Sequence, residues 1–408
     1  MESDEVLTAF LFDSQRALAL SRKLSEEQWQ ICLHAAVEHK ILPRAVAFYR
    51  RVSEQPLAPN FAAILDAHQR ERHSWLAACR ALQFDDGEMR AMLMKGFGHE
   101  MLYPERSERF AKDLDIVVQD LDAFCRFARQ LFQRGFSLPF LARLYLHPTQ
   151  GSWCGLGRFI FDRGLEDGGV ELHIGQFAID SHHVLDWQAI ASHACECHFA
   201  GIPLIVPDTV MKLKVFFMEL ATRPACMLRD LYDGHCLFAV LEPSQEAALR
   251  VQLGDAGLAD QVDKLLAAFK RYRLTPPEVL SRLADTLRVS ARPQPQPVTW
   301  QQRWRHWLDS ACEKEGWRLH VLSLLDRAWF TNLALRRGMT INALLIDDTP
   351  AEMKLTRQRH YLLLTTPAGT FLLGVCGLFS DEEVEQLQAA LRQKMPPAER
   401  LVEEKRDA

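Results

Sequence analysis

The spacing of apolar residues divides the chain into a helical beginning and a β-rich middle. Apolar residues recur every three or four positions through residues 6–20, 29–52 and 61–82, as in helices with one buried face. From about residue 89 the period changes, and short apolar runs follow one another between Gly, Pro and Asp residues. We therefore expect helices before this change and a sheet after it.

The β-rich middle alternates strand-like runs with two helical patterns. "FGHEMLY" predicts a short helix that Pro104 ends, and "DAFCRFARQLFQRG" predicts an amphipathic helix that Gly135 ends. The strand candidates are "MRAMLMKG" (89–96), "DLDIVV" (113–118), "FLARLYLHP" (140–148), "RFIFDRG" (158–164) and "GVELHIGQF" (169–177). Helices packed on a mixed sheet place the chain in the α+β class.

A second helical region follows Pro207, where Asp208 or Thr209 is suited to cap "VMKLKVFFMELA". The proline-rich "ARPQPQPV" then predicts a spacer, and residues 300–316 beyond it look helical. Further strand candidates are 317–323, 329–335, 340–346, 360–366 and 370–376, with "TPAGT" as a turn. Ser380 and Glu383 predict a capping box that opens the last helix.

These patterns predict a chain of consecutive segments. They are a helical N-terminal segment (1–88), a mixed sheet with helices (89–206), a helical segment (207–290), a linker (291–298) and a small C-terminal α+β module (299–408). Because the module has its own strands and its own helix cap, we expect it to fold alone.

The composition excludes few classes of function, but it indicates in which compartment we expect the protein. The 408 residues are 48% hydrophobic and 25% charged, with a formal net charge of −5 and no long block of one sign, so bulk attraction to nucleic acid or membrane is not expected. The N-terminus lacks a secretory signal, and no apolar run approaches the roughly 18–20 residues that span a bilayer. Together with scattered cysteines suited to reduced thiols, this predicts a cytoplasmic protein without a membrane partner.

Two aspartates inside an apolar run are the first candidates for metal ligands. On a strand, Asp113 and Asp115 share a face while Leu114 and Ile116 point the other way. Two carboxylates on one face repel each other unless a cation lies between them. A hard divalent cation such as Mg²⁺ fills this role and keeps positions open for phosphate.

Two further motifs fit the same chemistry. Glu171 lies in the strand candidate "GVELHIG", and His173 shares its face. Upstream, Lys95 and Gly96 form a turn from a strand into a helix, where backbone N–H groups favour a phosphate. The order of strand, turn, helix, Asp-x-Asp strand and later Glu strand indicates two-metal nucleotidyl transfer.

The pattern "MKGFGHEMLYP…R…DLDIVV…GVELHIG…IVPD…LRDLYD" resembles the uncharacterised nucleotidyltransferase family of the DNA polymerase-β-like superfamily. The resemblance covers about residues 25–245 and implies a polymerase-β-like palm. It implies Mg²⁺ or Mn²⁺ held by Asp113, Asp115 and Glu171, which would also be the catalytic residues, with NTP as substrate. The implied nucleotide-binding residues are Lys95, Gly96, Arg109, Lys212 and His173. One departure is that Lys95-Gly96 stands where the broader superfamily prefers Gly-Ser, so a Ser contact to phosphate is absent.

Several of these charged residues have an ordinary structural interpretation as well. Lys212 and Lys214 diverge on a helix, so at most one reaches a triphosphate, and either is equally well explained as a solvated lysine. An i, i+4 pair such as Arg229 with Asp233 is more often a stabilising or interdomain ion pair than part of the chemistry.

Two other motifs are weaker candidates. "HACECHFAG" carries soft ligands without the paired spacing of a zinc site, so we expect a partly buried helical or loop segment. "WQQRWRHW" interleaves Trp and Arg as a base-stacking surface does, but its tryptophans form a helical stripe typical of a core face.

The sequence therefore predicts a nucleotidyltransferase that moves a nucleoside monophosphate from NTP to an acceptor hydroxyl on a protein, a peptide, an RNA or a small molecule. Two alternatives remain open. One is a catalytically weak protein of the same fold that binds nucleotide or a peptide as a scaffold or regulator, and the other is a toxin-like transferase acting on tRNA or protein.

Overall fold

The computed structural model describes most of the chain. The described residues are 3–53, 55–81, 91–95, 97–103, 109–111, 113–138, 142–147, 149–161, 169–179, 183–199, 201–289, 327–358, 361–374 and 381–394. The predicted features at Gly96, at residues 291–298, at residues 300–323 and at Ser380 lie outside the described residues.

The chain divides into two compact units, and each unit draws on several separate segments. Unit 1 comprises Met1–Val117, Ile160–Glu171 and Gln176–Pro297, and unit 2 comprises Val118–Phe159, Leu172–Gly175 and Val298–Ala408. The segments predicted from the sequence are consecutive, whereas these units are not. The reason is that strands from distant parts of the chain pair in one sheet.

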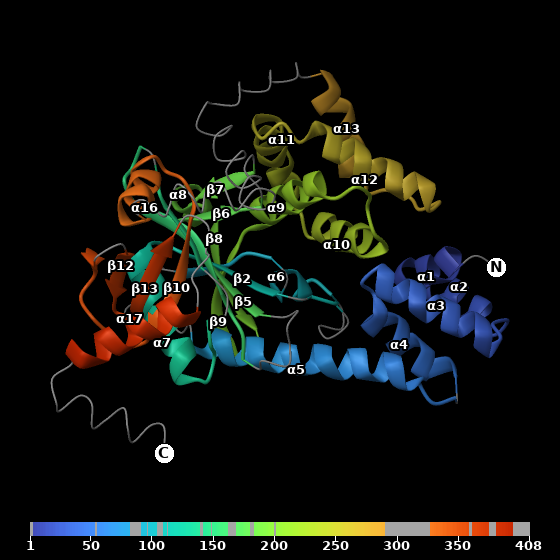
Figure 1. Ribbon diagram of the computed structural model, residues 1–408. Helices are drawn as coiled ribbons and strands as arrows, with labels where there is room; N and C mark the ends of the chain where they lie inside the picture. The colour runs from blue at the N-terminus through green and yellow to red at the C-terminus, as the bar shows by residue number, and fades with distance from the viewer. Residues whose placement is uncertain are drawn as a thin grey trace. The chain divides into compact units, whose positions relative to one another are not determined.

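The N-terminal helices of unit 1 are drawn in blue in Figure 1. They are α1 (Ser3–Phe12), α2 (Ser14–Ser21), α3 (Glu26–Glu38), α4 (Leu42–Val52) and the long α5 (Pro59–Ala81). The predicted helices over 6–20 and 29–52 are each split in two. Asp13 begins α2, because its side chain accepts a hydrogen bond from the Arg16 N–H, and Lys40 adopts a left-handed φ of 57° between α3 and α4.

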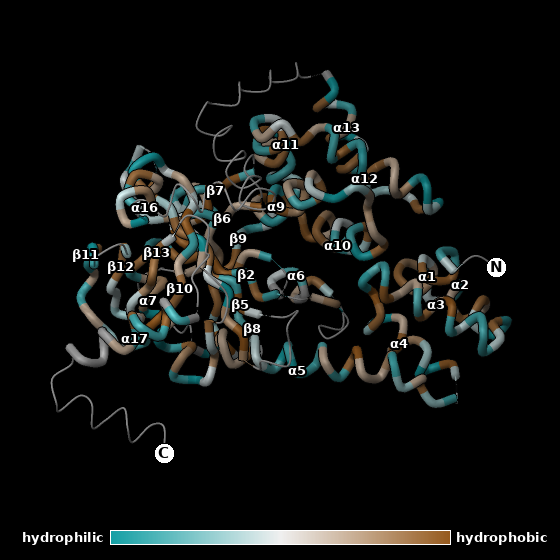
Figure 2. The backbone as a smooth tube through the Cα atoms, viewed as in Figure 1, coloured by the Kyte–Doolittle hydropathy of each residue, from teal (hydrophilic) through white to brown (hydrophobic). Residues whose placement is uncertain are grey.

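Helix α5 shows why the helical prediction works in this region. Its buried side chains include Phe61, Leu65, His68 and Trp75, which follow one another at helical spacing along one face. Apolar and polar residues alternate along the α5 tube in Figure 2. The same face therefore turns to the core throughout the helix.

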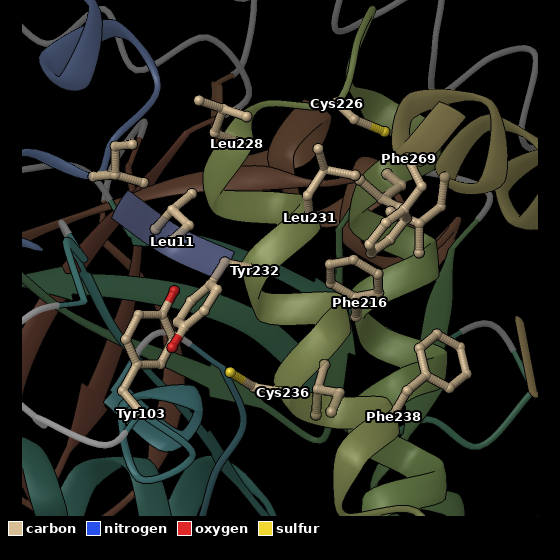
Figure 3. Packing of buried hydrophobic residues seen from close by; sticks show 14 of the residues in the cluster. Leu11, Tyr103, Phe216, Cys226, Leu228, Leu231, Tyr232, Cys236, Phe238 and Phe269 are labelled. Carbon is tan, nitrogen blue, oxygen red and sulfur yellow. The ribbon is translucent and has the colours of Figure 1, made fainter. Parts of the chain in front are cut away.

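The second helical part of unit 1 builds its core. These helices are α9 (Thr209–Thr222), α10 (Leu228–Ala239), α11 (Glu246–Asp255), α12 (Ala259–Arg271) and α13 (Glu278–Val289), with a short 3-10 helix at Pro243–Gln245 before α11. The predicted cap of α9 is confirmed, since Asp208 accepts a hydrogen bond from the Met211 N–H at 2.8 Å. Figure 3 shows Phe216, Leu231, Tyr232 and Phe269 among the side chains of this core.

Small elements complete unit 1. They are β1 (Ala91–Leu93), α6 (Phe97–Glu100), β6 (Gln176–Ala178), β7 (Val184–Asp186), α8 (Trp187–Ala191), β8 (Ala194–Phe199) and β9 (Ile202–Pro207). The expectation of a helical or loop segment at "HACECHFAG" is wrong, because β8 pairs antiparallel with β9 from Ala194–Pro207 to Phe199–Ile202. The partner strand supplies the reason: Ile202, Leu204 and Val206 are buried.

The central strands β2 (Asp113–Val118) and β5 (Gly169–Ile174) are confirmed as predicted from "DLDIVV" and "GVELHIG". The strand order of the main sheet is β1-β2-β5-β4-β3-β10-β13-β12-β11. With its mixed sheet and many helices, the protein has the predicted α+β fold class.

Unit 2 combines strands from the middle and the end of the chain. Its elements are α7 (Leu121–Gln133), β3 (Ala142–Leu146), β4 (Trp153–Phe159), α16 (Arg327–Arg336), β10 (Ile341–Asp347), β11 (Lys354–Gln358), β12 (Tyr361–Thr366), β13 (Gly369–Gly374) and α17 (Asp381–Lys394). Strand β10 pairs antiparallel with β3, with Ile341 opposite Leu144 and Ala343 opposite Ala142. The C-terminal strands therefore continue the sheet of β3 and β4 instead of forming a sheet of their own.

Sequence patterns in unit 2 mislead at two places. "WFTNLAL", predicted as a strand, lies in helix α16, where Ala328, Thr331 and Leu335 are buried at helical spacing and Trp329 is 58% exposed. Its aromatic and β-branched residues favour a strand only when they alternate between two faces. The strand predicted at residues 158–164 lies earlier, as β4, and β11 was not predicted.

Within the described ranges, we find no helix with both the length and the apolar character needed to cross a bilayer.

Candidate active site

The Asp-x-Asp motif opens strand β2. Asp113 is the first residue of the strand and is half-buried, whereas Asp115 is 3% exposed. Leu114 and Ile116, which alternate with the aspartates, are buried in the core. The strand thus holds both carboxylates on one face because its apolar residues anchor the other.

Strand β5 brings a second acidic residue to Asp115. Ligand atoms of Asp115, Glu171 and His173 all lie within 4.8 Å of one another, and they form the one group in the described part of the chain that could hold a metal ion. Glu171 and His173 share a face of β5 because they are two residues apart. The structure thus brings together Asp115 and Glu171, as expected, whereas Asp113 lies outside this group.

A backbone hydrogen bond places Lys95 beside Asp115. The N–H of Met94 donates to the carbonyl oxygen of Asp115 at 2.9 Å, just after β1 ends. The Lys95 ammonium then lies 3.5 Å from Asp115 Oδ1 and 2.9 Å from Glu219 Oε1. Burial alone would lower the pKa of Lys95, but the negative charges of Asp115 and Glu219 raise it above its ordinary value.

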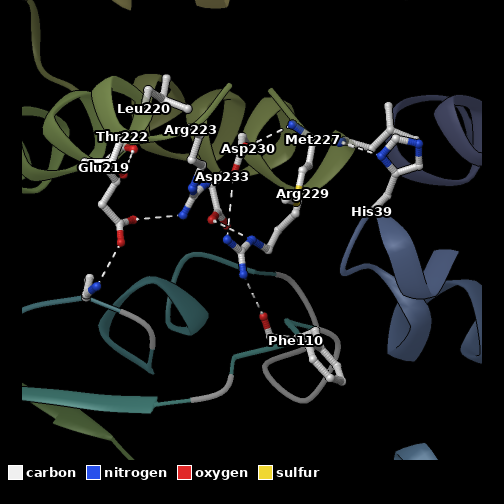
Figure 4. Close-up of polar contacts among 12 residues, drawn as sticks. His39, Phe110, Glu219, Leu220, Thr222, Arg223, Met227, Arg229, Asp230 and Asp233 are labelled. Carbon is white, nitrogen blue, oxygen red and sulfur yellow. Dashed lines mark hydrogen bonds and ion pairs between the residues drawn. The ribbon is translucent and has the colours of Figure 1, made fainter. Parts of the chain in front are cut away.

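Glu219 was missed by the sequence analysis. It lies on α9 and is part of a buried polar cluster that Figure 4 shows along α9 and α10. Burial would raise the pKa of its carboxyl group, but Lys95 and Arg223 lower it to about 2. A signal was present in the sequence: Glu219 is the only carboxylate in the helical stretch 210–221, whose other residues are apolar except for Lys212 and Lys214.

Arg109 forms a bidentate ion pair with Asp233 of α10. Its Nε donates to Asp233 Oδ1 at 3.0 Å and its Nη2 donates to Asp233 Oδ2 at 2.8 Å, while Tyr103 Oη donates to Asp233 Oδ1 at 2.8 Å. All three side chains are buried. Such a bidentate pair holds the segment before β2 against α10, so Arg109 is better placed to position the site than to meet a phosphate.

The motif "LRDLYD" forms a buried network on α10. Asp230 pairs with Arg223 and accepts a hydrogen bond from the Met227 N–H at 2.9 Å. Arg229 donates to the carbonyl oxygen of Phe110 at 3.4 Å (Figure 4), and its Nε lies 4.0 Å from Asp233 Oδ2. The network therefore joins α9, α10 and the chain before β2 by ion pairs.

Comparison with known proteins bears on this arrangement. Residues 25–273, more than half of the chain, match the model of a family described as uncharacterised nucleotidyltransferases. The chain belongs to this family. The resemblance predicted from the residues is thereby confirmed, and the matched segment includes Lys95, Asp115, Glu171 and Glu219.

Solved structures of similar proteins are distant. The Helicobacter pylori protein JHP933 is 15% identical with a TM-score of 0.31, over 57% of this chain and 93% of that one. An antigenic nucleotidyltransferase-like protein from Paracoccidioides brasiliensis is 15% identical with a TM-score of 0.28, over 48% of this chain and 91% of that one. At these TM-scores the structures add nothing to the family match. No curated protein matches the chain.

In this member of the family, the two lysines of α9 have different surroundings. Lys212 is buried, and burial lowers the pKa of its ammonium, with Cys197, Cys195 and Asp208 acting in the opposite direction. Among the described residues it makes no ion pair within 4.0 Å. Lys214 points elsewhere and donates to Gln252 Oε1 at 2.6 Å, as expected for positions that diverge on a helix.

His99 is a second buried polar residue that the sequence analysis did not single out. It is the third residue of α6 and is 1% exposed. Burial lowers its pKa to about 4, and the nearby Arg109 adds to this. The His99 ring is therefore neutral at pH 7, and neither ring nitrogen has a hydrogen-bond partner among the described residues.

The soft ligands of "HACECHFAG" are not gathered around one point. His193 Nδ1 lies 2.7 Å from Asp208 Oδ2, at the start of α9. Cys195 is exposed and Cys197 is half-buried. This pairing explains His193 without a metal ion.

Proposed function

We propose that this protein is a metal-dependent nucleotidyltransferase, which moves a nucleoside monophosphate from an NTP to an acceptor hydroxyl and releases pyrophosphate. The observation that carries the proposal is the meeting of Asp115, Glu171 and His173 within 4.8 Å. The Lys95 ammonium lies beside this group, and the chain belongs to a nucleotidyltransferase family.

The donor set fits a divalent cation. Carboxylate oxygens suit both Mg²⁺ and Mn²⁺, and the imidazole of His173 is compatible with Mn²⁺. When bound, such a cation would offset phosphate charge and make the acceptor hydroxyl easier to deprotonate. Asp113, on the same face of β2 as Asp115, is proposed as a further carboxylate ligand.

The residues of the chain itself have separate proposed roles. Glu171 holds the metal and accepts the proton of the acceptor hydroxyl, as a carboxylate base beside the reacting atoms does. Lys212 carries an ammonium without an ion-pair partner among the described residues, so it is suited to a triphosphate. Arg109 acts through Asp233, by holding the segment that leads into β2.

The proposal is tested by transfer of label. The full chain is incubated with α-labelled NTPs, Mg²⁺ or Mn²⁺ and a cell extract, and labelled molecules are separated. We expect one class of acceptor, whether protein, peptide, RNA or small molecule, to carry the label. Asp115→Asn and Glu171→Gln should each lower transfer by about a hundredfold or more, because even the partners of metal ligands contribute 10–100-fold.

The matched control is Asp66→Asn, which removes the same charge from an exposed position of α5. It should leave transfer unchanged. Undiminished transfer by Asp115→Asn would contradict the proposal. If NTP with metal raises the melting temperature but no molecule becomes labelled, the scaffold or regulator is the better interpretation, since a ligand that binds only the folded state stabilises it without any turnover.

A further inference from the structure

Lys95 is shared between two carboxylates with different surroundings. Its ammonium lies 2.9 Å from Glu219 Oε1 and 3.5 Å from Asp115 Oδ1. Asp115 belongs to the group that could hold a metal ion, and Glu219 does not. The positive charge of Lys95 therefore opposes a metal ion at Asp115, because like charges this close repel.

Glu219 is held independently of Asp115. Its other oxygen, Oε2, accepts a hydrogen bond at 3.4 Å from Nη2 of Arg223, the residue directly after α9 (Figure 4). The side chains beside Glu219 on α9, Phe216 and Leu220, are buried. The carboxylate thus stays in place whether or not Asp115 keeps Lys95 as a partner.

We propose that Lys95 is an internal cation that Asp115 exchanges for the metal ion, and that Glu219 is the positioning residue that retains Lys95 during the exchange. The inference rests on the proposed metal centre. Lys95 neutralises Asp115 while no metal is bound. When a metal ion takes Asp115, Lys95 keeps a carboxylate partner in Glu219, which makes the exchange less costly than leaving a half-buried ammonium unpaired.

The proposal predicts opposite effects at two contacting residues. Lys95→Met removes the competing charge, so Mn²⁺ should bind about tenfold more tightly. Glu219→Gln leaves Asp115 as the one carboxylate within 4.0 Å of the Lys95 ammonium in the described part of the chain, so Mn²⁺ should bind about tenfold more weakly. The double variant Lys95→Met with Glu219→Gln should bind as tightly as Lys95→Met, because Glu219 acts through Lys95.

The measurement is the electron paramagnetic resonance signal of free Mn²⁺, titrated with the full chain in the absence of nucleotide. Circular dichroism checks that each variant is folded. The matched control is Lys214→Met. It removes an ammonium from α9, the helix that carries Glu219, but this ammonium donates to the amide oxygen of Gln252 at 2.6 Å. Its Mn²⁺ affinity should equal that of the unchanged protein.

The outcomes separate this inference from the proposed function. Opposite shifts in the single variants, with the Glu219→Gln effect absent in the double variant, support the exchange. Shifts in the same direction, or an additive double variant, overturn it while leaving the metal centre in place. If neither the unchanged protein nor Lys95→Met binds Mn²⁺, the proposed metal centre fails and the inference fails with it.

Discussion

At the scale of single residues, unit 1 buries several charges and pairs them. Asp233 meets Arg109, Asp230 meets Arg223, and Glu219 meets Lys95. Burial would raise the pKa of Asp233, but the Arg109 guanidinium holds it well below its ordinary range. Arg109 and Asp233 are both buried, and removing one partner of such a pair costs about 3–5 kcal/mol, so this pair constrains substitution around the candidate site.

Because two histidines are buried, we expect the free energy of unfolding to fall in acid. Burial lowers the pKa of His68 and of His99 from 6.5 to about 4. Between pH 6.5 and pH 4 these histidines are protonated in the unfolded chain but neutral in the folded chain. Their contribution to the free energy of unfolding is therefore fully present above pH 6.5 and is lost as the pH falls toward 4. Each histidine contributes at most about 3 kcal/mol of this loss. Urea denaturation between pH 7 and pH 4 measures it.

Variants assign the effect to these rings. His99→Leu removes one titrating group, so the free energy of unfolding should fall less steeply between pH 6.5 and pH 4. His73→Gln, at an exposed position of α5, is the control and should leave the slope unchanged. Glu219, with its pKa lowered to about 2, loses its contribution only below its unfolded value of 4.5, and so mostly outside this window. An identical slope in His99→Leu would refute the assignment.

At the scale of elements, the turn between β12 and β13 depends on one glycine. Gly369 has a φ of +129°, and a β-carbon there would lie 2.3 Å from the carbonyl oxygen of Asp347. Asp347 closes the irregular end of β10, where the register with β13 shifts after Leu345. Because β10 approaches this turn so closely, position 369 requires a residue without a side chain.

Gly369→Ala should destabilise the protein by more than the roughly 1–3 kcal/mol of backbone strain alone, because the clash with Asp347 adds to it. Gly151→Ala is the matched control: it also has a positive φ, of +66°, but a β-carbon there would meet no atom within 4 Å. Equal losses in the free energy of unfolding for the two variants, measured in urea, would show that the contact with β10 has no effect.

At the scale of the whole molecule, unit 2 is built from segments that are far apart in the chain. Strand β10 pairs with β3, and β13 follows β10 in the sheet. The expectation that residues 299–408 fold alone is therefore not favoured, because a separate module would expose the edge of β10 that β3 now covers. The same pairing protects the edge of β3.

A chain that ends at residue 289 tests this dependence. It keeps every residue of the candidate site but loses β10 to β13, so the backbone groups of β3 that pair with β10 become an open edge. We expect it to associate, since open strand edges pair with other chains. Analytical ultracentrifugation beside the full chain measures this. A soluble truncated chain whose state of association matches that of the full chain would argue against it.

A feature could be predicted from the sequence where residues close together in the chain specify it. The period of residues 113–118 predicted β2 with its bounds, and the cap at Asp208 predicted the start of α9. "WFTNLAL" was read incorrectly because seven residues of mixed propensity do not show which face is buried. Asp115 and Glu171 were identified because carboxylates are conspicuous in apolar strands, whereas Glu219 lies on a helix where the sequence predicts only lysines as nucleotide-binding candidates.

The sequence by itself determined the helical and strand periods, the fold class and the family, because these follow from residue types at short spacing. Only the tertiary structure decided which buried charges meet. Lys95 and Glu219 are 124 residues apart, as are Arg109 and Asp233, yet each pair is in hydrogen-bond contact. A local period reports that a face is buried but carries no information on what packs against it. Partners across elements are therefore set by the packing of the whole unit.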